Sequence, residues 1–96
     1  MTVIYEWDVE TVQTYEDGDN DVLDHYHTET YADAVRYTAA QPPESGISYK
    51  IVLVRDDDDR RSWAYVEDGK LPDWCSDAYE HHWGRVPKRF HKEVAR

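Results

Sequence analysis

Three aspartates at alternate positions, Asp17, Asp19 and Asp21, are the residues whose spacing is most typical of metal chemistry. Alternating acids open the calcium-binding loop of an EF-hand, where carboxylate oxygens hold the ion. That loop also needs glycine at its sixth position and a bidentate glutamate at its twelfth. Here those positions are Val22 and Thr28, and the flanking segments alternate like strands. The pattern therefore predicts an acidic turn rather than a calcium site.

Two histidines, His25 and His27, are the next candidates for metal binding. Alternate side chains of a strand share a face and lie about 6.6–6.8 Å apart, so both imidazoles could reach one transition metal ion. Further ligands are offered later in the chain by Cys75, His81, His82 and His91. No two of these residues have the spacing of a zinc motif. A small His-based metal-binding protein is therefore kept as an alternative, and the main interpretation includes neither a metal nor a cofactor.

Nucleophilic catalysis has little support in the sequence. Cys75 lies in the segment DWCSD, between two aspartates that are expected to raise the pKa of its thiol rather than lower it. The sequence contains no G-x-S-x-G motif and no glycine-rich phosphate loop. We therefore expect that the protein is not an enzyme.

Negative charge is the dominant feature of the composition. The 96 residues carry 21 acidic side chains and 11 Lys or Arg, a formal net charge of −10. Residues 1–59 hold fifteen acids and three bases, whereas residues 60–96 hold six acids and eight bases. Such a chain should repel nucleic acid and anionic membranes and attract basic surfaces. The simpler alternative is that acidity only keeps a small protein in solution.

The acids of the first part fall into a row and two clusters. The row occupies alternate positions of the first expected strand, so its members lie nearly 7 Å apart on one face, within a factor of about two of the phosphate spacing along one DNA strand. The clusters lie at the end of the first hairpin and in the turn before residue 60. Together these twelve predicted partner-binding residues are Glu6, Asp8, Glu10, Glu16, Asp17, Asp19, Asp21, Asp24, Asp56, Asp57, Asp58 and Asp59.

The periodicity of apolar residues predicts the elements that carry these acids. Val3–Val12 and Val22–Thr28 alternate as the strands of a hairpin. Thr30 is a helix cap, and Pro42-Pro43 ends that helix. Two further strands are expected, at Ile47–Arg55 and Arg61–Glu67. We expect a single α+β domain over residues 1–96, with an antiparallel sheet in ββαββ order and a helix packed on one face.

The last quarter of the chain predicts two short helices. Asp73 could cap the first, in which Trp74, Cys75, Ala78, Tyr79 and Trp83 would face the core and Gly84 would mark the end. Pro87 opens the second, a short helical C-terminal tail, and residues 85–96 carry five bases and one acid. This basic tail could touch nucleic acid or membrane, but docking against the protein's own acidic sheet needs no further partner.

Four segments, VIYEWDV, YKIVLVRD, RRSWAYVEDGKLP and VPKRFHKEVAR, resemble those of small uncharacterised proteins found in bacteriophage and prophage genomes. The size, the acidity and the expected α+β domain are similar to those of phage-encoded anti-CRISPR proteins, several of which block effector complexes by mimicking DNA. No functional residues are implied by either resemblance. The N-terminus lacks the features of a signal peptide and the chain has a single cysteine, so we expect the cytoplasm of a bacterial host.

These observations together lead to one functional hypothesis and two alternatives. The hypothesis is a non-enzymatic phage-type inhibitor that binds a basic nucleic-acid-binding surface of a host complex, most specifically an anti-CRISPR protein, without contacting nucleic acid or membrane. The first alternative is an interaction module that forms a homodimer through an exposed strand or aromatic surface. The second alternative is the His-based metal-binding protein described above.

Overall fold

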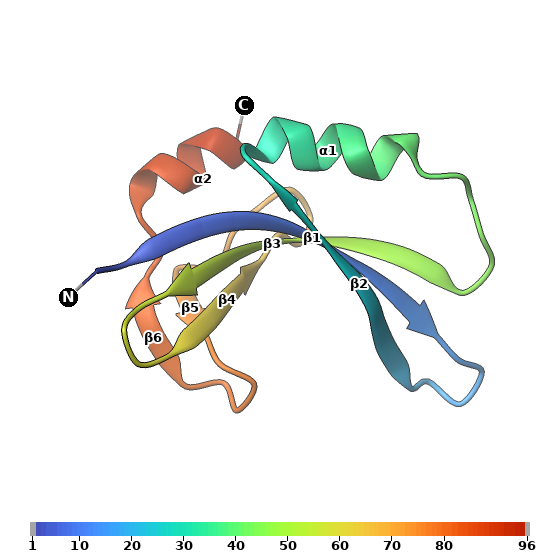
Figure 1. Ribbon diagram of the computed structural model, residues 1–96, viewed down its shortest axis with the longest axis horizontal. Coiled ribbons are helices and arrows are strands. Elements are labelled where there is room, and N and C mark those ends of the chain that lie inside the picture. Colours follow the sequence, from blue (N-terminus) through green and yellow to red (C-terminus); the bar gives the residue numbers. More distant parts are fainter. Residues whose placement is uncertain (1, 96) are drawn as a thin grey trace.

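The computed structural model describes residues 2–95, which form one antiparallel sheet with two helices above it (Figure 1). Along the chain the elements are β1 (Ile4–Thr14), β2 (Asn20–Thr28), α1 (Tyr31–Ala40), β3 (Ile47–Asp56), β4 (Arg61–Tyr65), β5 (Trp74–Ser76), β6 (His82–Arg85) and α2 (Lys88–Val94). The strands lie in the order β2-β1-β3-β4-β5-β6. The expected α+β class, with a helix on one face of the sheet and a short helical tail, is confirmed.

The alternation of β1 separates the two faces of the sheet, as the sequence predicted. Trp7 pairs with Leu53 of β3, which in turn pairs with Ala64 of β4, and all three side chains are buried. Trp7 also packs against Tyr31 of α1 at 5.3 Å and Phe90 of α2 at 6.0 Å between ring centroids. The main hydrophobic core therefore lies between the sheet and the helices, on what we call the helix face.

The first helix begins and ends where the sequence indicated. The Thr30 hydroxyl accepts a hydrogen bond from the Asp33 N–H at 3.1 Å, which satisfies one of the free donors of the first turn. A carboxylate from α2 adds to this end of the helix, because Glu93 accepts the N–H of Tyr31 at 2.7 Å. Negative charge at a helix N-terminus is favourable. Because the carboxylate belongs to α2, this hydrogen bond also links the two helices.

The region after β4 differs from the predicted helix, because residues 74–85 form the β5–β6 hairpin. The Asp77 carboxylate accepts the N–H groups of Tyr79 and His81 and fixes a turn between the strands. Glu80 and Gly84 have φ angles of 65° and 112°, which a right-handed helix does not allow. Cys75 is buried as expected, but Trp74 and Tyr79 are exposed. The helical interpretation was wrong because the turn chemistry of Asp77 outweighed the apolar spacing.

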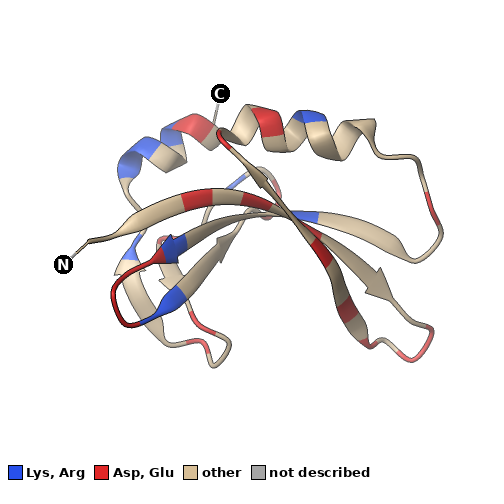
Figure 2. Cartoon of the chain, in the orientation of Figure 1, with Lys and Arg blue, Asp and Glu red and all other residues tan. Residues whose placement is uncertain are grey.

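The basic tail docks on the protein itself, although not on its acidic face. Phe90 packs on Tyr5 at 5.0 Å between centroids, and Val94 is buried in the main core. Within residues 2–95, no salt bridge joins Lys88, Arg89 or Lys92 to a carboxylate. Figure 2 shows the bases of α2 in the helix layer. Apolar burial therefore holds the tail, and its bases stay in the helix layer. Neither helix is long and apolar enough to cross a membrane.

Candidate functional site on the open face of the sheet

The face of the sheet opposite the helices carries the acidic row, and we call it the open face. Strand pairing defines its members: Glu6 pairs with Val54, which pairs in turn with Trp63, and Asp8 pairs with Val52, which pairs in turn with Tyr65. On the other side of β1, His27 pairs with Asp8 and His25 pairs with Glu10. The predicted sharing of one face by the two histidines is thus confirmed. Ionisable groups and two aromatic rings are gathered on one surface that no helix covers.

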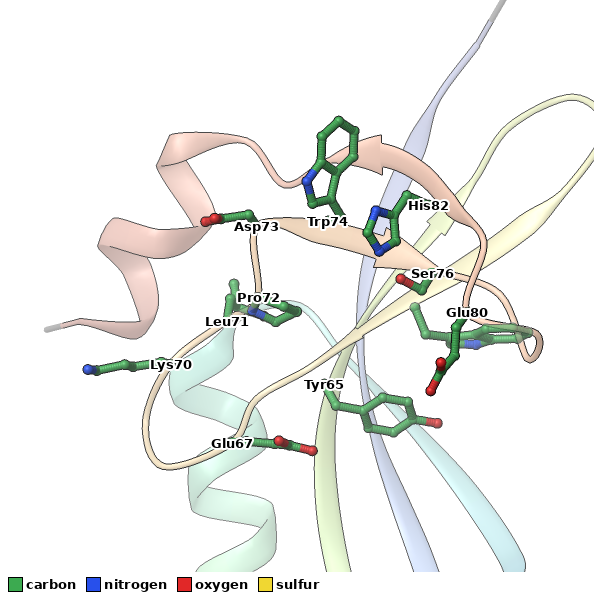
Figure 3. Close-up of a pocket in the computed structure, with 11 residues that line it drawn as sticks. Tyr65, Glu67, Lys70, Leu71, Pro72, Asp73, Trp74, Ser76, Glu80 and His82 are labelled. Carbon is green, nitrogen blue, oxygen red and sulfur yellow. The ribbon is translucent and has the colours of Figure 1, made fainter.

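A cleft of about 710 Å³ lies on this face. Asp8, Glu10 and His25 line it from β1 and β2, Trp63 and Tyr65 line it from β4, and the β5–β6 turn adds Asp77 and Glu80; Arg61, Ser76 and Ala78 complete the lining. A second pocket of about 780 Å³ shares Trp63, Tyr65, Ser76 and Glu80 with the cleft, so the two adjoin. Figure 3 shows this second pocket, with the stacked rings of Trp74 and His82 beside it and Lys70 directed away.

Glu10 is the buried carboxylate of the cleft, with only 6% of its side chain exposed. Both of its oxygens accept the Tyr65 hydroxyl at 3.0 Å, and His25 Nδ1 lies 3.8 Å from Oε2. Within residues 2–95, no Lys or Arg nitrogen lies within 4.0 Å of this carboxylate. Lys50 pairs with Glu10 across the strands and lies over the Tyr65 ring, 5.9 Å from its centroid. A buried carboxylate that makes no salt bridge to Lys or Arg leaves the cleft attractive to further positive charge.

The Tyr65 hydroxyl, which donates to Glu10, stays protonated. Burial, followed by the negative charge of Glu10 and its hydrogen bond, raises the pKa of Tyr65 well above the usual value of a tyrosine. Tyr65 therefore acts as a hydrogen-bond donor to Glu10 at all physiological pH values.

Glu6 and Asp8 lie closer to the open solvent than Glu10. Their side chains are 40% and 17% exposed, and His27 Nδ1 lies 3.9 Å from Glu6 Oε2 and 3.4 Å from Asp8 Oδ1. Arg61 also interacts electrostatically with Glu6 and Asp8. Its pKa is raised first by the hydrogen bond to Asp56 and, among smaller effects, by the charges of Asp8 and Glu6. The row is therefore partly neutralised at the end nearest Arg61.

Asp77 shapes the far wall of the cleft rather than offering a free charge. It accepts the indole N–H of Trp83 at 2.9 Å, besides the backbone N–H groups of Tyr79 and His81. These bonds, the one from Trp83 first, hold the pKa of the Asp77 carboxyl far below its usual value. Glu80 of the same turn is exposed, so it is the wall residue with an accessible carboxylate.

The two acidic clusters lie at opposite ends of β1, away from the cleft. Because Ile4 pairs with Asp56, the β3–β4 turn lies at the start of β1, while the β1–β2 turn lies at its end (Figure 2). Ten residue steps separate the ends of β1, which is roughly 33 Å. The twelve predicted residues therefore form a row and two distant tips rather than one patch.

The tip of the β1–β2 hairpin is the acidic turn that the sequence predicted. The Asp17 carboxylate accepts the N–H of Asp19 at 3.0 Å, and Asp21 accepts the Tyr15 hydroxyl at 3.0 Å, which raises the pKa of Tyr15. The oxygens of Asp17, Asp19 and Asp21 do not gather into a cluster with metal-ligand spacing within residues 2–95. Glu16 is exposed at the same tip, and Asp24 lies opposite Thr11, on the helix-face side of the strand.

Half of the β3–β4 cluster is occupied by the protein's own arginines. Asp56 binds Arg61 through both oxygens, and Asp57 binds Arg55 at 2.9 Å. Asp57 also accepts the N–H groups of Asp59 and Arg60, and these bonds, the one from Asp59 first, lower its pKa. Asp58 and Asp59 remain exposed. This cluster mainly builds a turn.

The remaining predicted ligands do not join the histidines. Cys75 is fully buried, and burial raises the pKa of its thiol. Among residues 2–95, the cluster with metal-ligand spacing consists of Glu6, Asp8 and His27, without His25, Cys75, His81, His82 or His91.

Sequence reasoning missed the residues that turn the acidic row into a cleft. Trp63 and Tyr65 lie in the strand predicted at Arg61–Glu67, but their position beside the row depends on the pairing of β4 with β3. Asp77 and Glu80 were missed because their segment was read as a helix. Comparison with known proteins adds no further identification, because no family model matches the chain and searches of curated proteins and solved structures returned no significant match.

Proposed function

We propose that this protein binds a basic surface of another protein through the cleft of the open face. The observation that carries the proposal is Glu10, a buried carboxylate with no Lys or Arg nitrogen within 4.0 Å among residues 2–95. It lines the cleft together with the more exposed Asp8 and the rings of Trp63 and Tyr65. A lysine or arginine side chain of a partner would meet carboxylates at its charged end and aromatic surface along its stem.

The distribution of counter-charges supports the same proposal. Of the twelve acids predicted to bind a partner, Asp56 and Asp57 are the two with Lys or Arg salt bridges within residues 2–95. The bases of α2 lie in the helix layer. Arg61 and Lys50 compensate the negative field of the open face only in part, which favours fast, salt-sensitive association with a cationic surface.

The partner that best suits such a surface is a protein built to hold nucleic acid. A groove lined with Lys and Arg binds phosphates by releasing their counterions, and a folded polyanion competes for the same groove. The proposed action is occupancy without catalysis. In its most specific form the protein is a phage-encoded inhibitor of a bacterial host complex, an anti-CRISPR protein that denies target DNA to the effector.

The general proposal is tested by capturing bacterial lysate proteins on the immobilised chain and eluting them with salt or duplex DNA. A variant with Glu6→Lys and Glu80→Lys reverses one charge of the acidic row beside the cleft and one charge of the cleft wall. Glu10 is left intact because a buried lysine there would disturb folding. The matched control is Glu29→Lys with Glu44→Lys, which makes the same charge change at exposed positions elsewhere.

The proposal predicts that DNA displaces the captured proteins and that the Glu6/Glu80 variant binds them at least about tenfold more weakly at 0.1 M salt. The Glu29/Glu44 control should behave like the wild type. Equal capture by both variants, or capture that DNA does not displace, contradicts the proposal. The specific form is tested by adding the protein to guide-loaded CRISPR effectors and measuring target-DNA binding by gel shift.

The alternative of a homodimer is favoured by one observation, the edge strand β2. Eight of its nine residues are exposed, and Val22, Leu23 and Tyr26 are each about half exposed. Unpaired N–H and C=O groups on such an edge can pair with a second copy. Light scattering at low and high salt separates the two functions, since pairing through β2 should persist at high salt and binding to a basic partner should not.

A further inference from the structure

Three side chains of the open face converge at the edge of the acidic row. Glu6 and Asp8 lie two residues apart on β1, and His27 faces Asp8 from β2. One ligand atom from each, either a carboxylate oxygen or an imidazole nitrogen, lies within 4.8 Å of both others. The imidazole Nδ1 thus lies within 4.0 Å of both carboxylates.

The separations are close to those of a metal site. With metal–ligand bonds of about 2.0–2.2 Å, two ligand atoms lie about 3.0 Å apart in octahedral geometry and about 3.4 Å apart in tetrahedral geometry. His27 Nδ1 already lies 3.4 Å from Asp8 Oδ1 and 3.9 Å from Glu6 Oε2. The His27 and Glu6 side chains are 52% and 40% exposed, so they are free to close the remaining gap.

The neighbouring histidine provides an internal comparison. His25 lies on the same strand face and approaches Glu10, but that carboxylate is buried and both of its oxygens accept the Tyr65 hydroxyl. A metal at His25 would have to displace this bond and would find one carboxylate. The His27 position offers two carboxylates, and within residues 2–95 the only salt bridges of these carboxylates are to the His27 imidazole.

We propose that Glu6, Asp8 and His27 form a binding site for a divalent first-row transition metal ion, with Zn²⁺ as the ion to test first. One imidazole nitrogen with two carboxylate oxygens suits Zn²⁺, Co²⁺ or Ni²⁺ better than Ca²⁺ or Mg²⁺, which prefer oxygen ligands alone. The site faces solvent, so water or a partner side chain would complete the coordination. The ion would also cancel the two negative charges of Glu6 and Asp8, so metal and basic partner would compete.

The test uses the full chain purified without a histidine tag and treated with chelator. Isothermal titration with Zn²⁺ should show one ion per chain, and Co²⁺ should give visible absorption bands of a protein-bound ion. His27→Ala should weaken Zn²⁺ binding by about tenfold or more, because one of three ligands is lost. The matched control His25→Ala should change the affinity less than about twofold, because that residue is not a ligand.

The proposal is overturned by absence of stoichiometric Zn²⁺ binding to the wild type, or by equal losses in the two histidine variants. Asp8→Asn provides a second check, since it should weaken binding as His27→Ala does. Circular dichroism of each variant without metal confirms folding, which is expected because both histidines are exposed. The measurement uses the protein and the metal alone, so its outcome is independent of whether a basic partner binds the cleft.

Discussion

Replacement of Tyr65 by phenylalanine removes one hydroxyl and should reveal how strongly the cleft holds its buried charge. That hydroxyl donates to both oxygens of Glu10 at 3.0 Å, and 6% of the Glu10 side chain is exposed. A hydrogen bond to a charged group contributes about 1.5–3 kcal/mol, and a buried acceptor left without its donor costs a similar amount. We therefore expect Tyr65→Phe to lower the free energy of unfolding by about 1.5–3 kcal/mol.

Urea unfolding followed by tryptophan fluorescence measures this loss at neutral pH. Tyr79→Phe is the matched control: its side chain is 82% exposed, so its loss should stay within about 0.5 kcal/mol. In a Glu10→Gln background the same Tyr65→Phe change should cost less, about 0.5–1.5 kcal/mol, because the acceptor is then neutral. A loss below about 0.5 kcal/mol for Tyr65→Phe, or an equal loss in both backgrounds, would refute the reasoning.

Three further predictions concern the β5–β6 region. Asp77→Asn should flatten the fall in stability between pH 4 and 2. The pKa of Asp77 is lowered in the folded protein, first by the Trp83 N–H, so the carboxylate adds stability above its unfolded pKa of 3.8, and this stability is lost in acid. Urea melts across this pH range measure the change in stability, and an unchanged slope would contradict the account. Gly84→Ala should destabilise the fold by about 2 kcal/mol or more, since φ is 112° and the new Cβ would lie 2.6 Å from Arg55 Nε. Thermal melting tests this prediction, and a melting temperature equal to that of the wild type would contradict it. Cys75 should react with a thiol reagent only after unfolding, because it is fully buried and its pKa is raised; rapid labelling of the native protein would show that the site opens.

The parts of the fold that local patterns dictate were predictable. The alternation of β1, the Thr30 cap and the β-branched run of β3 each depend on neighbours within a few residues, and each element formed close to its predicted bounds. The β5–β6 hairpin was not predictable by the same reasoning. Its apolar residues have helical spacing, but the bonds to Asp77 and the positive φ of Glu80 select a turn.

The site was predictable as a charge pattern but not as a cleft. The alternation of Glu6, Asp8 and Glu10 placed them on one face, which the strand register confirms. Their environments differ because of partners that are distant in the sequence: Glu10 meets Tyr65, 55 residues away, through the pairing of β1 with β3 and of β3 with β4. No local pattern reports that encounter, and therefore the burial of Glu10 had to come from the structure.

The central claim, that the cleft of the open face receives cationic side chains, is tested most directly by nuclear magnetic resonance. A short arginine-rich peptide is titrated into the ¹⁵N-labelled protein at low salt, and the titration is repeated at high salt. The account predicts saturable, salt-sensitive shifts centred on Asp8, Glu10, Trp63 and Tyr65, with little change at the β1–β2 tip. Shifts confined to the tip residues 16–21, or spread evenly over all the acidic residues, would contradict it.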